Sequence, residues 1–166
     1  MPRRFCVALC ITVLLLAVLS TACSNNTKPP SYIKELVTYE EGDGIVVYFI
    51  LADDKGEMTG CDGTAAIEIW QEYTDWVGWD LVDRTKTVYE KSRTVKAADF
   101  QKTKAGTGPF EHDIYAYFWG RIAKSDLTPL VEDAFSMGKI QLTFSPSTPL
   151  TGKEKLIVKD TCFLPE

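Results

Sequence analysis

The sequence predicts an all-β domain, an antiparallel sandwich of two sheets, on three observations. Short runs rich in β-branched and aromatic residues recur from residue 32 onward, several of them alternating between apolar and polar side chains. Clusters of Gly, Asp and Pro separate the runs, as turns require. No long segment with the apolar period of an amphipathic helix alternates with these runs, which argues against a parallel α/β sheet.

The first half of the domain contains three of the predicted strands. Ile33–Glu40 is mixed in polarity and predicts an edge strand, followed by a Gly-Asp-Gly turn at residues 42–44. Ile45–Ala52 is apolar on both faces, which is typical of a central strand that is covered on both sides. A polar loop with three glycines spans 53–63, and the alternation of Ala65–Tyr73 predicts a half-buried strand.

The middle of the domain contains two more segments with the pattern of strands. Thr85–Val95 is rich in β-branched residues and lysine and predicts one or two strands. Residues 97–100 are compatible with a single helical turn, and "KTKAGTGP" at 102–109 predicts another turn. His112–Ile122 is a long aromatic run and predicts a strand.

Two strands complete the domain. Residues 125–137 predict a short helix or loop, with Ser125 as its cap. Lys139–Phe144 and Lys155–Lys159 predict strands separated by a proline-rich turn. The best interpretation is an immunoglobulin-like or fibronectin-like antiparallel β-sandwich of about seven strands with at most one short helix. A small barrel is the second interpretation.

The N-terminus has the features of an export signal. Arg3 and Arg4 precede an uncharged apolar run, Phe5–Leu19, which is shorter than the roughly 20 residues of a membrane-spanning helix. Ser20-Thr21-Ala22 then leads into Cys23. This arrangement resembles a bacterial lipoprotein signal with its lipobox, although Ser20 stands where that family usually has leucine.

The resemblance implies the organisation of the chain and its location. Residues 1–22 would be the signal peptide, 23–31 the lipidated cysteine with a short polar tether, and 32–166 a single domain. Cys23 would carry acyl chains that anchor the protein to the cell membrane, or to an outer membrane, on its extracytoplasmic side. The alternatives are an ordinary cleaved secretory signal and an uncleaved anchor helix.

Charge restricts the partners of the mature chain. Loss of Arg3 and Arg4 leaves 16 Lys and Arg against 23 Asp and Glu, a formal charge of −7. This balance argues against nucleic acid and against a basic contact with anionic lipids, because the lysines form no stripe. We therefore expect membrane contact through Cys23 alone.

Two cysteines remain once Cys6 and Cys10 leave with the signal and Cys23 is lipidated. These are Cys61 and Cys162, and in an oxidising compartment we expect them to form a disulfide. The alternative is a pair of free thiols. The sequence contains no C-x-x-C, so a redox motif or a cysteine zinc site has no support.

The sequence shows no complete catalytic motif. Ser31–Lys34 matches S-x-x-K, but the partner motifs S-D-N and K-T-G are missing. His112 is the only histidine, and we expect it to be a buried or edge side chain bonded to backbone. An acidic loop with Asp53, Asp54, Glu57 and Asp62 could hold calcium loosely, but a solvated hairpin loop is the simpler interpretation. We thus predict no catalytic residue, no metal and no cofactor.

The segment Trp70–Asp83, "WQEYTDWVGWDLVD", holds three of the four tryptophans. If this segment is a loop, Trp70, Tyr73, Trp76 and Trp79 are candidate binding residues, since aromatic rings can contact sugars, cations and peptides. More commonly, such aromatic residues cover a sheet edge and close the core. The exposure of Trp76 and Trp79 distinguishes the two roles.

Three function classes follow. The leading class is a membrane-anchored interaction module for a protein, peptide or envelope polymer, which requires an exposed aromatic or apolar patch. The second is an accessory or architectural subunit of an envelope complex. The last is a carboxylate-based hydrolase, which requires two converging acids, one with a raised pKa.

Overall fold

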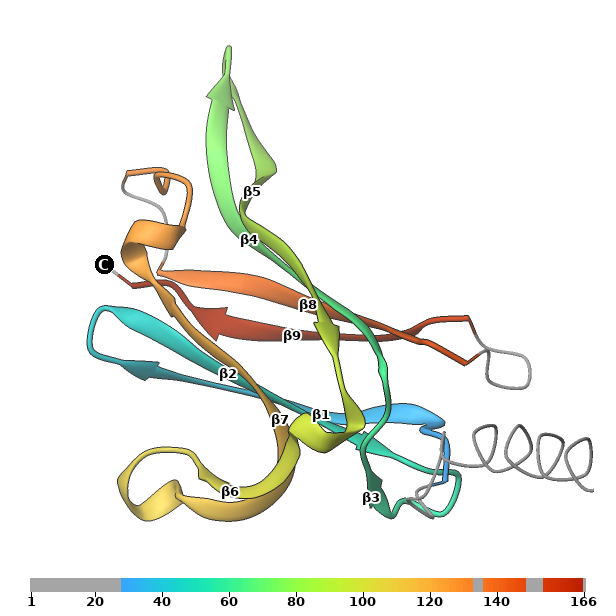
Figure 1. Cartoon of the computed structure of the whole chain (residues 1–166). Coiled ribbons are helices and arrows are strands. Elements are labelled where there is room, and N and C mark those ends of the chain that lie inside the picture. Colours follow the sequence, from blue (N-terminus) through green and yellow to red (C-terminus); the bar gives the residue numbers. More distant parts are fainter. Residues whose placement is uncertain (1–27, 133–135, 149–153, 166) are drawn as a thin grey trace, which may run out of the picture.

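The computed structural model describes residues 28–132, 136–148 and 154–165 and consists of two antiparallel β-sheets packed face to face (Figure 1). The prediction of an all-β sandwich is therefore confirmed. The predicted signal peptide, Cys23 and the tether before Lys28 lie outside the described residues. Within the described ranges, no helix has the length and apolar character needed to cross a membrane.

Within the described ranges, each sheet has four main strands. Sheet A contains, in spatial order, β1 (Tyr32–Glu41), β2 (Gly44–Ala52), β7 (His112–Ala123) and β6 (Phe100–Ala105), and the short β3 (Met58–Thr59) pairs with β2. Sheet B contains β5 (Asp80–Val95), β4 (Gly63–Val77), β8 (Met137–Pro146) and β9 (Leu156–Phe163). In the part of the chain that the structure describes, three single 3₁₀ turns lie between strands: η1 (Ala97–Asp99), η2 (Gly108–Phe110) and η3 (Lys124–Asp126).

The strand order is that of an immunoglobulin-like sandwich. Without the two-residue β3, the described strands can be lettered A, B, C, C′, D, E, F and G in chain order. The sheets then read A-B-E-D and C′-C-F-G. In this scheme β4 and β5 are the C–C′ hairpin, which belongs to the edge of sheet B.

The main core lies between the sheets. Side chains that alternate along the strands meet there, among them Phe49 of β2, Trp119 of β7 and Phe144 of β8. A smaller cluster covers the outer face of sheet A around Ile50 and Ile114. The two clusters explain why β2 is apolar on both faces, and they confirm that it is a central strand.

Two strands were missed by the sequence analysis. Residues 100–105 form β6, although most of this range was predicted as a turn. As an edge strand of sheet A, β6 carries exposed Lys102 and Lys104 and so lacks the apolar alternation of an inner strand. The other is β3, whose two residues are too few to form a pattern. The expected helical turn is present as η1.

Candidate binding site at the tip of the β4–β5 hairpin

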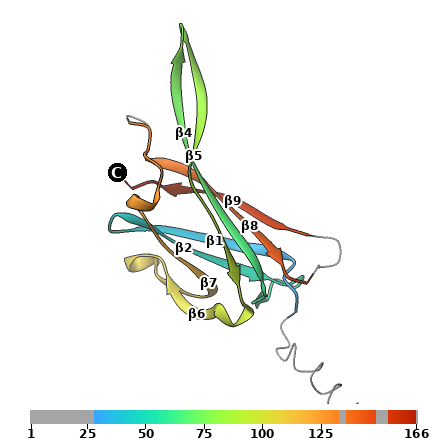
Figure 2. The ribbon, with the colours of Figure 1, turned by 45° about the horizontal axis from the view of Figure 1, so that its top comes forward.

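The β4–β5 hairpin extends beyond the rest of sheet B. Pairing between β4 and β8 ends at Gln71 opposite Gly138, whereas β4 and β5 stay paired as far as Val77 and Asp80. Residues 72–77 and 80–85 thus form a two-stranded ribbon about 20 Å long. Both views show this ribbon standing clear of the sandwich (Figure 1 and Figure 2).

The segment Trp70–Asp83 is therefore a continuous hairpin, and its interpretation as a loop was wrong. Its strands are joined by the two residues Gly78 and Trp79. Gly78 has φ +69°, in the left-handed region that a non-glycine residue rarely adopts. A glycine at this position lets the chain reverse within two residues.

Five large apolar side chains gather at the end of the hairpin, which we call the tip (residues 76–82). Trp79 in the turn is 96% exposed, Trp76 is 64% exposed and Leu81 is 60% exposed. Val77 and Val82 are also exposed. Concentrations of exposed apolar residues on soluble domains mark contact surfaces.

The apolar side chains point in more than one direction. Trp76 lies directly opposite Leu81, so these two share one face of the ribbon. Val77 and Val82 belong to the opposite face, because side chains alternate along a strand. Trp79 occupies the end between them. The tip is therefore apolar on both faces and at its end.

Three aspartates border the apolar residues. Asp75 pairs with Arg84 Nε at 3.4 Å, and the Thr74 hydroxyl donates to Asp83 at 3.4 Å. The side chain of Asp80, beside Trp79, makes no hydrogen bond or ion pair with any residue that the structure describes. Its carboxylate relies on water alone in the isolated domain.

The base of the hairpin is held firmly by the domain. Buried Gln71 accepts from the backbone N–H of Val131 at 2.7 Å and donates to its carbonyl at 3.3 Å. The Lys86 ammonium donates to the Pro129 carbonyl at 2.6 Å. The ammonium of Lys159 lies 5.8 Å from the ring centre of Trp70. A fixed base thus supports a projecting tip.

The structure divides the four aromatic residues singled out from the sequence. Trp70 and Tyr73 are half-buried and belong to the base or the stem of the hairpin. Trp76 and Trp79 are exposed at the tip, so core closure, the more common role of such residues, is wrong for these two. Val77, Leu81 and Val82 also belong to the tip and were not predicted from the sequence. The available signal was "WVGWDLV" at 76–82, in which a two-residue turn with a glycine lies between the apolar pairs Trp76-Val77 and Leu81-Val82.

The predicted disulfide between Cys61 and Cys162 is absent, and both thiols are free. Cys61 precedes the start of β4, near Gly63 opposite Pro146, whereas Cys162 lies opposite Gly138 at the other end of β8. The span from Pro146 to Gly138 alone is about 26 Å of strand, against the 4.4–6.8 Å usual between Cα atoms of a disulfide. The prediction failed because cysteine counting carries no information on register. Burial raises the pKa of Cys162 to about 12.

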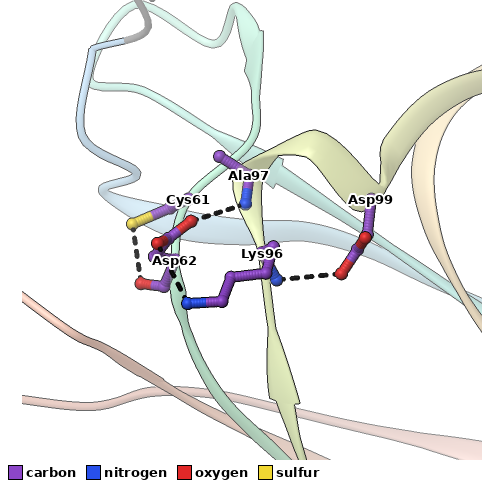
Figure 3. Close-up of polar contacts among 5 residues, drawn as sticks. All are labelled: Cys61, Asp62, Lys96, Ala97 and Asp99. Atoms are coloured by element: carbon purple, nitrogen blue, oxygen red, sulfur yellow. Dashed lines mark hydrogen bonds and ion pairs between the residues drawn. The ribbon is translucent and has the colours of Figure 1, made fainter. Parts of the chain in front are cut away.

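Two acids of the supposed calcium loop bind backbone instead of converging. Burial raises the pKa of Asp53, but the N–H groups of Lys55 and Glu57 and the Lys28 ammonium outweigh it and lower the pKa below its usual value. Asp62 accepts from the Ala97 N–H at 2.8 Å, which lowers its pKa and joins the start of β4 to η1 (Figure 3).

Other chemistry-bearing groups in the described ranges stand apart. No set of three or more His, Cys, Asp or Glu side chains within those ranges is placed to hold a metal ion. His112 is exposed, with Nδ1 3.1 Å from the Phe110 carbonyl. It has the backbone partner expected from the sequence.

Comparison of the chain with protein-family models, curated proteins and solved structures gives no match.

Proposed function

We propose that this protein is a lipid-anchored, extracytoplasmic binding module and that the hairpin tip is its contact surface. The observation that carries the proposal is the concentration of exposed Trp76, Trp79 and Leu81 on a ribbon that extends beyond sheet B. The lipobox-like sequence ending at Cys23 supports the anchored part of the proposal.

Exposed aromatic groups at the tip contribute little to folding. An isolated two-stranded ribbon is at best marginally stable in water. Its apolar side chains gain burial only when another surface covers them, and tryptophan is strongly enriched among residues that dominate binding energy. The arrangement is thus better suited to association than to support of the core.

The hairpin also points the tip away from the anchored end of the domain. Lys28, the first described residue, accepts from the Thr59 hydroxyl at 2.8 Å and its ammonium pairs with Asp53 at 3.6 Å. These contacts place Lys28 near the start of β4, while the tip is at its other end, about 45 Å further along the strand. In our proposal the partner lies away from the anchoring membrane.

The test compares the full chain with two variants matched in number of substitutions. The tip variant is Trp76→Ser/Trp79→Ser/Leu81→Ser, and the control variant changes three exposed apolar residues elsewhere: Phe110→Ser/Ile157→Ser/Phe163→Ser. Membranes from producing cells are dissolved in mild detergent and the size of each species is measured by sedimentation. We expect a larger complex for the wild type and the control and its loss in the tip variant.

Equal sedimentation of all three proteins would refute a contact at the tip. The anchor is tested separately by labelling producing cells with a radioactive fatty acid, which the wild type should incorporate and Cys23→Ser should not. Equal labelling of the two proteins would contradict lipid attachment at this residue.

A further inference from the structure

We propose that the partner is a protein with an apolar pocket that encloses the tip and a lysine or arginine inside that pocket that pairs with Asp80. This inference rests on the proposed function and specifies the chemistry of the surface that the tip recognises. It follows from the distribution of apolar groups around the ribbon, from the unpartnered Asp80 and from the position of the anchor.

The directions of the side chains indicate a concave receptor. A flat surface could cover Trp76 and Leu81, but it would leave Val77 and Val82 on the opposite face in water. Trp79 extends from the end of the ribbon and is almost fully exposed. Only a pocket or cleft can cover both faces and the end together.

Asp80 adds a charge requirement to this pocket. It follows Trp79 in the chain and lies opposite Val77, so a pocket that encloses either residue also takes up the Asp80 carboxylate. A carboxylate removed from water is strongly unfavourable unless a cation or several donors replace its hydration. Because no described residue of this chain supplies such a group, the partner must supply it.

The other two aspartates need no such partner. Asp75 already pairs with Arg84, and Asp83 accepts from Thr74. Both lie further from the turn than Asp80, on the side of the base. They fit the solvated rim of an interface, and they make the approach favourable for a positively charged pocket mouth.

A lipid bilayer fits the same observations less well. Insertion of Trp79 would carry Asp80 toward the hydrocarbon region, where carboxylates are disfavoured. The formal charge of −7 of the mature chain opposes approach to anionic lipids. Lys28, the described residue nearest to the proposed anchor, also lies at the opposite end of β4 from the tip.

The test places the photo-crosslinking residue p-benzoyl-phenylalanine at position 81 of the full chain in producing cells. The matched control has it at position 157, where Ile157 of β9 is similarly exposed. We expect a protein adduct from position 81 that is weaker or absent from position 157. Mass spectrometry of the adduct then identifies the contacted peptide of the partner.

Reversal of the charge at Asp80 tests the proposed lysine or arginine of the partner. Asp80→Lys should lower the yield of the adduct about tenfold or more, whereas Asp54→Lys, an equal charge change in an exposed loop, should leave it unchanged. Replacing the lysine or arginine of the contacted peptide by aspartate should restore the adduct with Asp80→Lys. This rescue would be specific to a direct pair.

The other outcomes separate the two proposals. If Trp79→Ala abolishes the adduct but Asp80→Lys does not, the inferred cation is overturned and the proposed function remains intact. An adduct with lipid alone would overturn the protein pocket. A protein adduct that is insensitive to Trp79→Ala, or no adduct at position 81, would refute the tip as contact surface and the inference with it.

Discussion

Replacing Trp79 by alanine should leave the stability of the domain almost unchanged, although tryptophan is the largest side chain. The side chain is 96% exposed, so about 10 Å² of it is buried in the folded domain. At about 25 cal/mol per Å², the expected loss in free energy of unfolding is ~0.3 kcal/mol. Urea unfolding followed by far-ultraviolet circular dichroism measures this difference.

Trp119 provides the internal comparison. It is 1% exposed, its indole N–H donates to the Tyr89 hydroxyl at 3.2 Å, and the Arg93 guanidinium lies 4.6 Å from the ring centre. Trp119→Ala should cost about 3–5 kcal/mol. If that variant does not fold, Trp119→Phe should still lose about 1–3 kcal/mol, because the Tyr89 hydroxyl loses its donor. A loss above about 1 kcal/mol for Trp79→Ala would refute a free tip, since the indole would then pack against the domain in solution.

Three further predictions concern the rest of the domain. Unfolding without reductant should expose Cys61 and Cys162 as free thiols to an alkylating reagent, whereas a bridge would protect both. In the folded domain Cys162 should react more slowly, because it is buried and its raised pKa leaves little thiolate. Asp53 has a lowered pKa when folded, so its ionised form stabilises the domain above the usual aspartate value of about 4, and this contribution disappears as the pH falls through the folded value. Asp53→Asn should therefore unfold more easily than the wild type at pH 7, with the difference shrinking in acid denaturation curves below pH ~4; a pH-independent difference would contradict this role. Gly63→Ala should lower the free energy of unfolding by about 1–3 kcal/mol in urea titrations, because its Cβ would lie 2.6 Å from the Ser145 carbonyl oxygen, and an unchanged midpoint would show that the strands can move apart.

The fold class could be predicted because local patterns agree with the sandwich over most of the chain. Ile45–Ala52 is apolar on both faces and has a core on each side, and Ala65–Tyr73 alternates where β4 lies between the core and solvent. The pattern fails at β6, where edge lysines replace apolar residues. It also fails beyond Gln71, where β4 leaves the core and burial no longer imposes an alternation.

The candidate site could be predicted in part. The concentration of tryptophan identified the segment, but local sequence does not show whether an aromatic side chain meets a neighbouring layer. Exposure of Trp76 depends on where β8 stops pairing with β4, which is a property of the whole sheet. The predicted disulfide between Cys61 and Cys162 was wrong for the same reason. Whether Cys61 can reach Cys162 depends on the registers of β4 with β8 and of β8 with β9. A count of cysteines contains no information on these registers.

The pairing of β4 with β8 has a mechanical consequence. A pull between an anchor near Lys28 and a partner held at the tip would run along β4, parallel to the strands of sheet B. Nine residue pairs join β4 to β8. Under such a shearing load these pairs are strained together, whereas a perpendicular pull would open them one after another. The domain would then act as a stiff link that resists extension, and a bound tip would detach before the sheet yields.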